Sequence, residues 1–336
     1  MSKYLITGGA GYIGSHVVKQ LIEKKNDIVI VDNLSTGFQK TVNTLKKYAL
    51  TKKVKLGFYK LDLADSKKLE TVFAKENVQG VVHFAASIVV SESVRDPLKY
   101  YSNNTGNTIN LLKACLKYKV NKFIFSSTAA VYGDPDPKTI PLKEDGITIP
   151  ISPYGSSKLF NEKIIQDVAL ANTNFKYVIL RYFNVAGASV DGLLGQSTKD
   201  ATHLIKIALE ITLGKREKMF INGTDYNTPD GTCIRDYIHV DDLASAHIKS
   251  LYYLNKNKGG IFNCGYGKGF SVREVIGMMK KVSGNDFKVE TTKRREGDPA
   301  IVIADNSKIV NEMDWKPKYD DLKIMCETAL AWEKKL

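Results

Sequence analysis

The segment YLITGGAGYIGSH (residues 4–16) decides the fold class of this chain. A short apolar run that predicts a β-strand leads into glycines spaced G-x-x-G-x-x-G, and a segment of helical period follows. Glycines allow a sharp turn and let a pyrophosphate approach backbone N–H groups at the positive end of the helix. A glycine-rich turn alone is a weak signal, but a strand before it and a helix after it strengthen the interpretation.

Strands and helices alternate beyond this segment. We expect strands at 4–7, 28–32, 54–60, 80–84, 123–126 and 177–182, and helices at 12–24, 66–76, 97–118 and 153–170. Continuous apolar strands separated by helices predict a doubly wound α/β (Rossmann) domain, with a parallel sheet covered on both faces. The strand at 177–182 is expected to close that sheet.

The second half of the chain has a less regular pattern. The polar, glycine-containing stretch after residue 184 predicts a smaller α/β substrate lobe over 185–336, following a dinucleotide-binding domain over 1–184. Parts of 237–265 are expected to return to the first domain. The segment Ser271-Val272-Arg273-Glu274 is a capping box, which predicts the start of a further helix.

Composition argues against several classes of protein. The 336 residues are 43% hydrophobic and 25% charged, which is typical of a globular protein, and no segment approaches the roughly 18 apolar residues of a membrane span. The four cysteines and five histidines lack metal-ligand spacing, so no metal site is expected. A net charge of +13 arises from dispersed lysines, which suits an anionic substrate better than a nucleic acid. Without a signal-peptide pattern, a cytoplasmic location is expected.

An acidic residue ends the second expected strand. Asp32 stands 18 positions past Gly14, where a carboxylate accepts hydrogen bonds from both hydroxyls of an adenosine ribose. It would repel a 2′-phosphate, so NAD is favoured over NADP as the cofactor. Asp62, after the third strand, either contacts the adenine or caps the next helix, and the sequence favours neither.

The strongest chemical signal is a tyrosine and a lysine at the start of an expected helix. Tyr154 and Lys158 are four residues apart, which places the phenol and the ammonium on one helical face. A nearby cation stabilises a phenolate, so we expect Lys158 to lower the pKa of Tyr154 and make it a general base. By itself, such a pair is more often an ordinary surface pair.

The position of a third residue strengthens the catalytic interpretation. Thr128 follows the strand at 123–126, at the carboxyl edge of the sheet, where ligands bind in open α/β folds. A hydroxyl there can share the proton of a reacting alcohol, although a strand-end hydroxyl often only bonds its own backbone. The three residues together indicate hydride-transfer chemistry.

Nine motifs carry a resemblance to a known family. They are GGAGYIGSH (8–16), VDNL (31–34), HFA (83–85), PLKYYSNN (97–104), FIFSSTAAVYG (123–133), SPYGSSK (152–158), LRYFN (180–184), GTCIRDYIHV (231–240) and RREGDP (294–299). With them the chain resembles, along nearly its whole length, the extended short-chain dehydrogenase/reductases, and within them the UDP-sugar 4-epimerases. The resemblance implies NAD-dependent, redox-neutral interconversion of UDP-glucose and UDP-galactose. In such enzymes NAD takes the C4 hydride, and the 4-keto sugar turns over in the pocket before the hydride returns to its opposite face.

The resemblance also implies the binding residues and the oligomeric state. Cofactor contacts are expected from Gly8, Gly11, Tyr12, Ile13, Gly14, Asp32, Asn33, Asp62, Leu63, Phe84, Ala85, Ala86, Asn103, Ser126, Tyr154, Lys158 and Tyr182. Substrate contacts are expected from Thr128, Asn184, His203, Leu204, Arg235, Arg295, Asp298 and Val302. The two arginines suit the diphosphate because a guanidinium binds it in a bidentate way. A homodimer is expected, with the helices near 97–118 and 153–170 pairing across a two-fold axis.

A few positions depart from the family pattern. Ile88 stands where some members have a lysine near the cofactor diphosphate. His203 replaces the asparagine that some members have in the uracil-binding turn, and Thr128 replaces the serine at the catalytic hydroxyl position. Val302 falls at the position that gates the sugar pocket, where a tyrosine excludes N-acetylated sugars. Because valine is much smaller, activity on UDP-GlcNAc and UDP-GalNAc is also predicted.

Three alternatives remain open at this point. A nucleotide-sugar 4,6-dehydratase begins with the same oxidation, but those enzymes carry an Asp-Glu pair after the hydroxyl residue, and Ala129-Ala130 follow Thr128 here. A nucleotide-sugar decarboxylase is the second alternative, and no motif favours it. The third is a non-catalytic NAD-binding regulator, which would have no need for Thr128, Tyr154 and Lys158 together.

Overall fold

A seven-stranded parallel sheet forms the centre of the molecule. A computed structural model describes residues 2–198, 202–257, 259–295 and 297–336. The sheet has the order β11-β6-β5-β4-β1-β2-β3, with the strands β1 (Lys3–Thr7), β2 (Asp27–Asp32), β3 (Leu56–Lys60), β4 (Gly80–His83), β5 (Lys122–Ser126), β6 (Lys176–Tyr182) and β11 (Gly259–Cys264). The chain order reverses between β1 and β4, so a crevice is expected beyond the carboxyl ends of these two strands.

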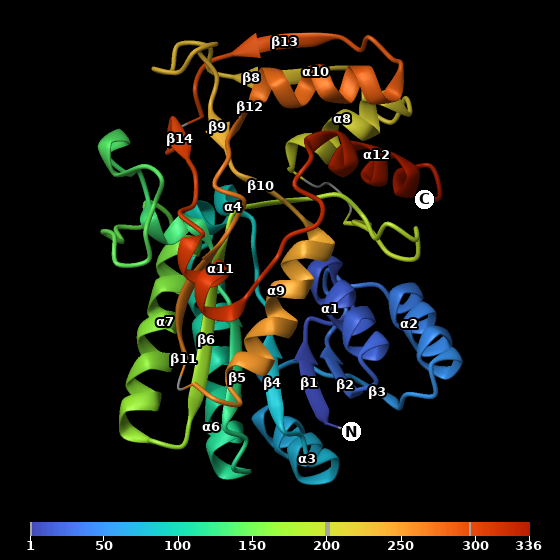
Figure 1. Ribbon diagram of the computed structural model, residues 1–336, viewed down its shortest axis with the longest axis vertical. Coiled ribbons are helices and arrows are strands. Elements are labelled where there is room, and N and C mark those ends of the chain that lie inside the picture. Colours follow the sequence, from blue (N-terminus) through green and yellow to red (C-terminus); the bar gives the residue numbers. More distant parts are fainter. Residues whose placement is uncertain (1, 199–201, 258, 296) are drawn as a thin grey trace.

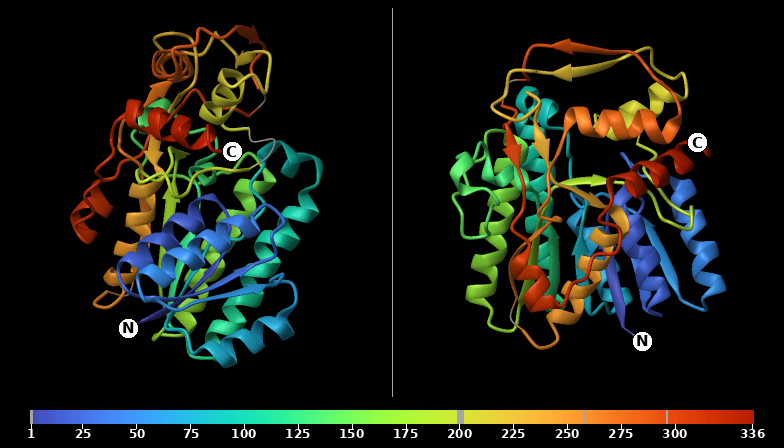
Figure 2. Two further views of the ribbon diagram at one scale, coloured as in Figure 1. Left: turned by 90° about the vertical axis from the view of Figure 1, so that its right-hand side faces the viewer. Right: turned by 45° about the horizontal axis from the view of Figure 1, so that its top comes forward.

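Helices cover both faces of the sheet, as Figures 1 and 2 show. One face packs against α1 (Tyr12–Glu23), α2 (Gln39–Thr51) and α9 (Val240–Tyr253). The other packs against α3 (Ser66–Glu76), α6 (Asn107–Lys117) and α7 (Pro153–Ala171). Because successive strand residues point to opposite faces, Ile6 joins the first core and Leu5 the second. The predicted doubly wound α/β fold is confirmed.

The segment expected as one helix at 97–118 is broken. It consists of α5 (Pro97–Tyr100), a π-helical turn η1 (Tyr101–Gly106) and α6, with α4 (Val90–Arg95) before it. The expectation of a single α-helix is therefore wrong. A π-helical turn changes the side-chain register locally and is frequent at functional sites. Here Asn104 from η1 donates to the Ser87 carbonyl (3.0 Å) and accepts from the Ser87 N–H (2.8 Å), which ties the turn to the loop after β4.

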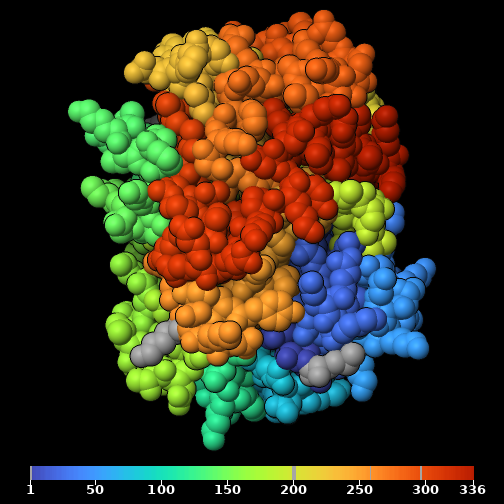
Figure 3. Space-filling model, viewed as in Figure 1, coloured from blue at the N-terminus to red at the C-terminus, as the bar shows by residue number. Residues whose placement is uncertain are grey.

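Smaller sheets lie beyond the carboxyl edge of the main sheet, at the top of Figure 1. They pair β7 (Asn184–Ala186) with β10 (Tyr237–His239), β9 (Ile234–Arg235) with β12 (Phe270–Ser271) and β14 (Ile301–Val302), and β8 (Met219–Asn222) with β13 (Val289–Thr292). The remaining helices are α8 (Leu204–Thr212), α10 (Val272–Ser283), α11 (Ser307–Met313), α12 (Leu322–Glu333) and the 3-10 turns η2 (Ala129–Tyr132) and η3 (Pro137–Thr139). In Figure 3 the C-terminal residues, red, cover much of the visible face.

One expectation about this half is wrong: β6 does not close the main sheet, because β11 pairs outside it in parallel. Within 237–265, β11 joins the main sheet and α9 packs on it, whereas β10 pairs with β7 in a separate sheet. The capping box at Ser271 is present, since its hydroxyl accepts from the Glu274 N–H and the Glu274 carboxylate accepts from the Ser271 N–H. The division at residue 184 stays a prediction. No helix among the described residues is long and apolar enough to span a bilayer.

Candidate active site

The glycine-rich turn between β1 and α1 has room only for glycine. Gly8 has a φ of +69°, and a Cβ there would lie 2.8 Å from the Ala85 nitrogen. A Cβ on Gly14 would lie 2.3 Å from the Gly8 carbonyl oxygen. Helix α1 begins after Gly11 without a side-chain cap, so the N–H groups of its first turn are available to an anion. The turn has the form of a phosphate-binding cradle.

Two of the expected cofactor residues lie at the start of α1. The N–H groups of Tyr12 and Ile13 belong to its first turn. The Tyr12 side chain points toward the second half of the chain, where its hydroxyl donates to the Gly187 carbonyl at 2.5 Å. Any contact of Tyr12 with a phosphate at the cradle would therefore use its backbone.

The carboxylate of Asp32 lies beside the cradle at the end of β2. Its oxygens accept from the N–H groups of Ala10 (2.9 Å) and Leu34 (2.8 Å). Burial raises the pKa of Asp32, and these two hydrogen bonds oppose the shift. The remaining lone pairs are available to ribose hydroxyls.

The neighbouring residues extend this site toward β3 and α6. Asn33 donates to Asp62 at 2.8 Å, and Leu63 is buried, with its carbonyl accepting from Asn110. Helix α3 is capped by Asp65, whose carboxylate accepts from the Lys68 N–H. The alternative that Asp62 caps this helix is therefore wrong, which leaves Asp62 beside Asn33 as a candidate for the adenosine end of a cofactor.

Thr128, Tyr154 and Lys158 converge beyond the end of β5. Tyr154 is the second residue of α7, which Ser152 caps by accepting from the Gly155 N–H. All three side chains are buried, with exposed fractions of 9%, 8% and 3%. The Lys158 ammonium donates to the Ser126 carbonyl at 2.8 Å and lies over the Phe125 ring. The cluster predicted from sequence is thus assembled in one place.

The protonation of this cluster differs from the sequence-based expectation. Burial raises the pKa of Tyr154, and a hydrogen bond with the Thr128 side chain opposes the shift. Burial lowers the pKa of Lys158 to about 7, with the Glu162 carboxylate opposing. The expectation that Lys158 lowers the pKa of Tyr154 is wrong, because the ammonium is directed to the Ser126 carbonyl and burial raises the pKa of the phenol.

The other expected cofactor residues lie in the loop after β4, on η1 and at the ends of β5 and β6. Asn103, on η1, donates to the Ser87 hydroxyl at 3.1 Å, and Ala85 and Ala86 lie half-buried in the same loop. The Phe84 ring packs against His247, with ring centroids 4.7 Å apart. His247 also lies 2.7 Å from the Ser126 hydroxyl. Burial raises the pKa of Tyr182, and a hydrogen bond with the Ser126 side chain opposes the shift.

Apart from Thr128, the residues expected to contact substrate form two groups. Asn184, His203 and Leu204 line one pocket, together with the side chains of Gln196, Tyr237 and Trp332. In the second group the Arg235 guanidinium pairs with the Asp298 carboxylate, Val302 pairs with Arg235 in the strand register, and the side chain of Arg295 is exposed.

Val302 also belongs to a small apolar cluster near the catalytic threonine. The buried members of this cluster are Val131, Tyr132, Leu142, Phe183, Val302 and Ala304, and Ala129 packs against them. Because Ala129 directly follows Thr128, this cluster connects Val302 with the catalytic end of β5.

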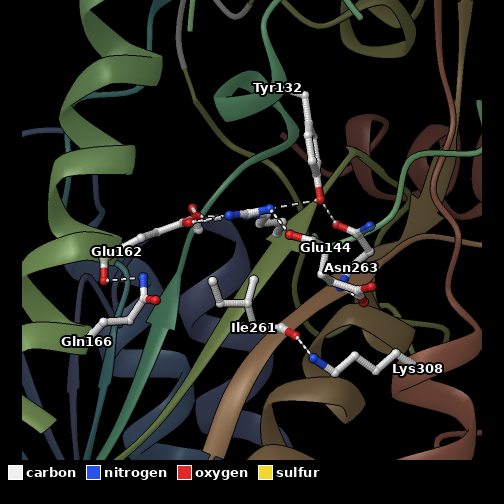
Figure 4. A network of polar contacts seen from close by, with 9 residues as sticks. Tyr132, Glu144, Glu162, Gln166, Ile261, Asn263 and Lys308 are labelled. Atoms are coloured by element: carbon white, nitrogen blue, oxygen red, sulfur yellow. Dashed lines mark hydrogen bonds and ion pairs between the residues drawn. The ribbon is translucent and has the colours of Figure 1, made fainter. Parts of the chain in front are cut away.

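Sequence reasoning missed a buried polar network next to the catalytic cluster (Figure 4). Glu162 of α7 accepts three hydrogen bonds from Arg181 of β6, and the Ser127 hydroxyl donates to the same carboxylate. Arg181 also donates to the Tyr132 hydroxyl at 3.0 Å, which in turn donates to Asn263 at 2.7 Å. The four-residue step from Lys158 to Glu162 was the available signal, but it predicts only a shared helical face.

The chain combines a parallel sheet of this strand order with a phosphate cradle and a buried tyrosine and lysine. These three features are typical of dinucleotide-dependent oxidoreductases. Residues 4–265 match the family model described as the NAD dependent epimerase/dehydratase family. The chain is 47% identical over 335 residues to a UDP-glucose 4-epimerase of Azospirillum brasilense, covering 99% of this chain and 92% of that relative. The protein belongs to the NAD-dependent epimerase/dehydratase family.

Solved structures agree with this assignment. A UDP-Glc/GlcNAc 4-epimerase of Campylobacter jejuni is 53% identical, with a TM-score of 0.87 and full coverage of both chains. The UDP-glucose 4-epimerase of Bifidobacterium longum, solved with NAD+ and UDP, is 38% identical with a TM-score of 0.94, over 99% of this chain and 98% of that one. The likeness therefore extends over the whole chain, including the strands and helices after residue 265, which lie beyond the family model.

Proposed function

We propose that the protein catalyses the UDP-glucose 4-epimerase reaction, the interconversion of UDP-glucose and UDP-galactose through a 4-keto sugar. The observation that carries the proposal is the buried Thr128–Tyr154–Lys158 cluster beside the phosphate cradle. It lies in a chain that is 47% identical over nearly its whole length to a UDP-glucose 4-epimerase.

The residues at the carboxyl edge fit NAD. Gly8 and Gly14 leave room where a Cβ would collide, and a Cβ on Gly11 would lie 3.3 Å from the Gly8 carbonyl oxygen, so the backbone can approach a pyrophosphate. Asp32 suits a ribose with a free 2′-hydroxyl, because a 2′-phosphate would bring further negative charge against its carboxylate. When bound, NAD supplies the acceptor and donor of the C4 hydride and a positive charge that favours the phenolate of Tyr154.

The side chains of the cluster then divide the proton chemistry among themselves. Tyr154 takes the proton of the sugar 4-hydroxyl and returns it to the same oxygen when the epimer forms. The Thr128 hydroxyl accepts from the Ala130 N–H at 3.2 Å and lies close enough to the phenol to oppose the rise of the Tyr154 pKa, so it can orient the phenol. Lys158 holds the end of β5 through the Ser126 carbonyl, and its ammonium is within the same helical turn as the phenol.

The diphosphate must stay fixed while the sugar turns over. Arg235 is preoriented for this by its pair with Asp298, and the exposed side chain of Arg295 is free to reach an anion. Asn184, His203 and Leu204 line one pocket, which suits the uridine and phosphate end of the substrate.

The competing reactions find less support. A 4,6-dehydratase needs an acid and a base for water elimination, and the two residues after Thr128 are alanines in η2. Nothing in the described cluster favours decarboxylation. A non-catalytic regulator would have no use for a buried lysine whose pKa is lowered to about 7 by burial, because such a group costs stability.

We also infer that N-acetylated UDP-sugars are substrates. Val302 lies in the apolar cluster with Ala129 and Phe183, and its side chain is much smaller than that of a tyrosine. The UDP-Glc/GlcNAc 4-epimerase of Campylobacter jejuni is 53% identical to this chain.

A homodimer is the assembly we propose. Large apolar side chains are exposed along α4, α5 and α7, where Val94, Leu98 and Phe160 have exposed fractions of 62%, 74% and 49%. The Tyr101 ring stacks on Phe160, with centroids 5.8 Å apart. An apolar face of this kind is typical of a surface covered by a partner, and helices related by a two-fold axis present the same face to each other.

The dimer is tested by light scattering of charged variants. Leu98→Glu and Phe160→Glu should give monomers. Leu50→Glu, at a residue of α2 with an exposed fraction of 76%, is the matched control and should leave the dimer intact. A wild-type protein that is monomeric at micromolar concentration would refute the assembly.

We further infer that the protein works in the cytoplasm. All four cysteines are buried and free, as is usual for proteins of a reducing compartment. Fractionation of cells that produce the protein would test this, because recovery of the protein in an exported fraction would contradict it.

The reaction is tested with purified protein and UDP-galactose, without added NAD, by NMR of the sugar products. UDP-glucose should appear at constant total nucleotide sugar. UDP-GlcNAc should also be converted to UDP-GalNAc. If neither pair reacts even with NAD supplied, the proposed function is wrong.

A further inference from the structure

A buried ion pair joins the two elements that carry the catalytic groups. Glu162 lies one turn after Lys158 on α7, and the exposed fractions of Glu162 and Arg181 are 0% and 3%. Arg181 donates to the carboxylate through Nε and Nη2, the latter at 2.7 Å. Apolar residues often replace such pairs without loss of stability, since burying two charges is costly. Stability alone is therefore a poor reason for this pair.

The pair reaches β5 directly beside the catalytic threonine. The hydroxyl of Ser127 donates to the Glu162 carboxylate, while its backbone N–H donates to the Leu180 carbonyl at 2.8 Å. Thr128 is the next residue, so its backbone is fixed on one side by Ser127. The distance between Thr128 and α7 thus depends on the carboxylate of Glu162.

The same pair also holds the segment after the threonine. Arg181 Nη1 donates to the Tyr132 hydroxyl and to the Glu144 carbonyl, both at 3.0 Å. Tyr132 is the last residue of η2, which begins directly after Thr128. Its hydroxyl donates to Asn263 of β11 at 2.7 Å, as Figure 4 shows. The backbone of Thr128 is therefore fixed on both sides through one guanidinium–carboxylate pair.

We propose that the Glu162–Arg181 pair is a positioning unit for the reaction, which fixes the Thr128 hydroxyl against the Tyr154 phenol and the Lys158 ammonium against the end of β5. This inference rests on the proposed epimerase function for its activity readout. Neither partner touches the reacting atoms, so both are positioning residues and not catalytic ones.

The charge of Glu162 has a second consequence for Lys158. Burial lowers the pKa of Lys158 to about 7, and the Glu162 carboxylate opposes this shift. On β4, His83 lies between the hydroxyls of Thr7 and Thr108, and burial lowers its pKa to about 3, so it is neutral near pH 7. The other titratable groups around Lys158 and Ser126 are Tyr154, Tyr182 and His247. Glu162 is therefore a negative charge that favours the protonated form of Lys158 and opposes the effect of burial on its pKa.

Variants of the full-length, NAD-loaded enzyme separate position from charge. Ser127→Ala removes one hydroxyl, and kcat should fall about tenfold with KM within about twofold, because misplacement acts on the chemical step. Glu162→Gln should lower kcat about 100-fold and move the alkaline limb of the kcat–pH profile about one unit lower, since Lys158 then loses its proton more readily. Glu162→Asp keeps the charge but shortens the side chain, so kcat should fall while the alkaline limb stays in place.

The matched control is Glu76→Gln. Glu76 also accepts from a cation, Lys3 (3.2 Å), and from a hydroxyl, that of Tyr59 (2.5 Å), but it ends α3, and its partner Lys3 begins β1 at the amino edge of the sheet. This variant should change neither kcat nor the pH profile. Melting temperature and bound NAD are measured for every variant, so that a loss of fold or cofactor is separated from a loss of rate.

The outcomes distinguish the two proposals. If the wild-type enzyme epimerises no UDP-sugar, the proposed function fails. If the wild-type enzyme is active and the folded, NAD-loaded Ser127→Ala and Glu162→Asp variants keep wild-type kcat, the positioning role is wrong and the pair is only structural. These two variants decide the matter even if Glu162→Gln does not fold.

Discussion

Replacing Lys158 by methionine should stabilise the cofactor-free protein while it abolishes turnover. Burial lowers the pKa of Lys158 from 10.5 to about 7. Between these values the unfolded chain holds a proton that the folded protein has lost, so the free energy of unfolding increases as the pH rises through this window. Methionine has a similar length and carries no charge, and it removes this dependence together with the catalytic ammonium.

The change in the free energy of unfolding follows from the pKa shift of Lys158 and from one lost hydrogen bond. At about 1.4 kcal/mol per pKa unit, the lowered pKa costs the folded protein about 4 kcal/mol at pH 7. The substitution also leaves the Ser126 carbonyl, now 2.8 Å from the ammonium, without its donor, which costs about 1–3 kcal/mol. The net gain is about 1–3 kcal/mol at pH 7. Near pH 10 the charge cost falls to about 1 kcal/mol, so the gain disappears or reverses there.

The assay is thermal unfolding of nucleotide-stripped protein at pH 7 and pH 10. The methionine variant should melt several degrees higher than wild type at pH 7, at about 2 °C per kcal/mol, and no higher at pH 10. Lys67→Met, at an exposed lysine of α3, is the control and should show no such pH dependence. The assignment of a costly buried ammonium would be refuted if the methionine variant had a lower melting temperature than wild type at pH 7. It would also be refuted if the difference in melting temperature between variant and wild type were the same at pH 7 and pH 10.

Three further substitutions test the cradle, the base and the pocket. Gly14→Ala should abolish NAD retention, since its Cβ would lie 2.3 Å from the Gly8 carbonyl oxygen. The control Gly277→Ala, whose Cβ would meet nothing within 4 Å, should retain NAD and stabilise α10 by about 1 kcal/mol. Absorbance of released nucleotide measures NAD retention, and melting curves measure stability. Tyr154→Phe should lower kcat by at least about 100-fold with NAD still bound, measured by NMR of the products, and near-normal turnover would remove Tyr154 as the base. Val302→Tyr should eliminate activity on UDP-GlcNAc and spare UDP-galactose; unchanged turnover of the acetylated sugar would place the gate elsewhere.

The fold could be predicted from sequence because its signals are local. The apolar run of β1, the glycines from Gly8 to Gly14 and the carboxylate of Asp32 lie within one continuous segment, and each restricts the backbone by itself. The sequence predicts that parts of 237–265 return to the first domain, but not that β11 pairs outside β6, because this pairing joins residues about 80 positions apart by contacts that no local pattern encodes. The π-helical turn at 101–106 likewise departs from the period of the flanking helices.

The residues of the candidate site could be predicted from the sequence, but their pKa values could not. Tyr154 and Lys158 are linked by helical spacing, so their common position follows from sequence. The Lys158 ammonium points toward the Ser126 carbonyl because of the packing between α7 and β5. The pKa values of Tyr154 and Lys158 depend on the same packing. The Glu162–Arg181 pair joins α7 with β6, and neither residue has a sequence pattern that names its partner.

The most direct test of redox-neutral epimerisation at C4 is to follow a deuterium atom placed at C4 of UDP-galactose into the product. The purified protein is incubated with UDP-[4-²H]galactose in ordinary water without added NAD, and the products are analysed by NMR and mass spectrometry. The account predicts UDP-glucose of unchanged mass with the deuterium still at C4, because the hydride returns to the carbon it left. Deuterium at C6 with loss of water would identify a 4,6-dehydratase, and deuterium lost to the solvent would contradict the retained hydride.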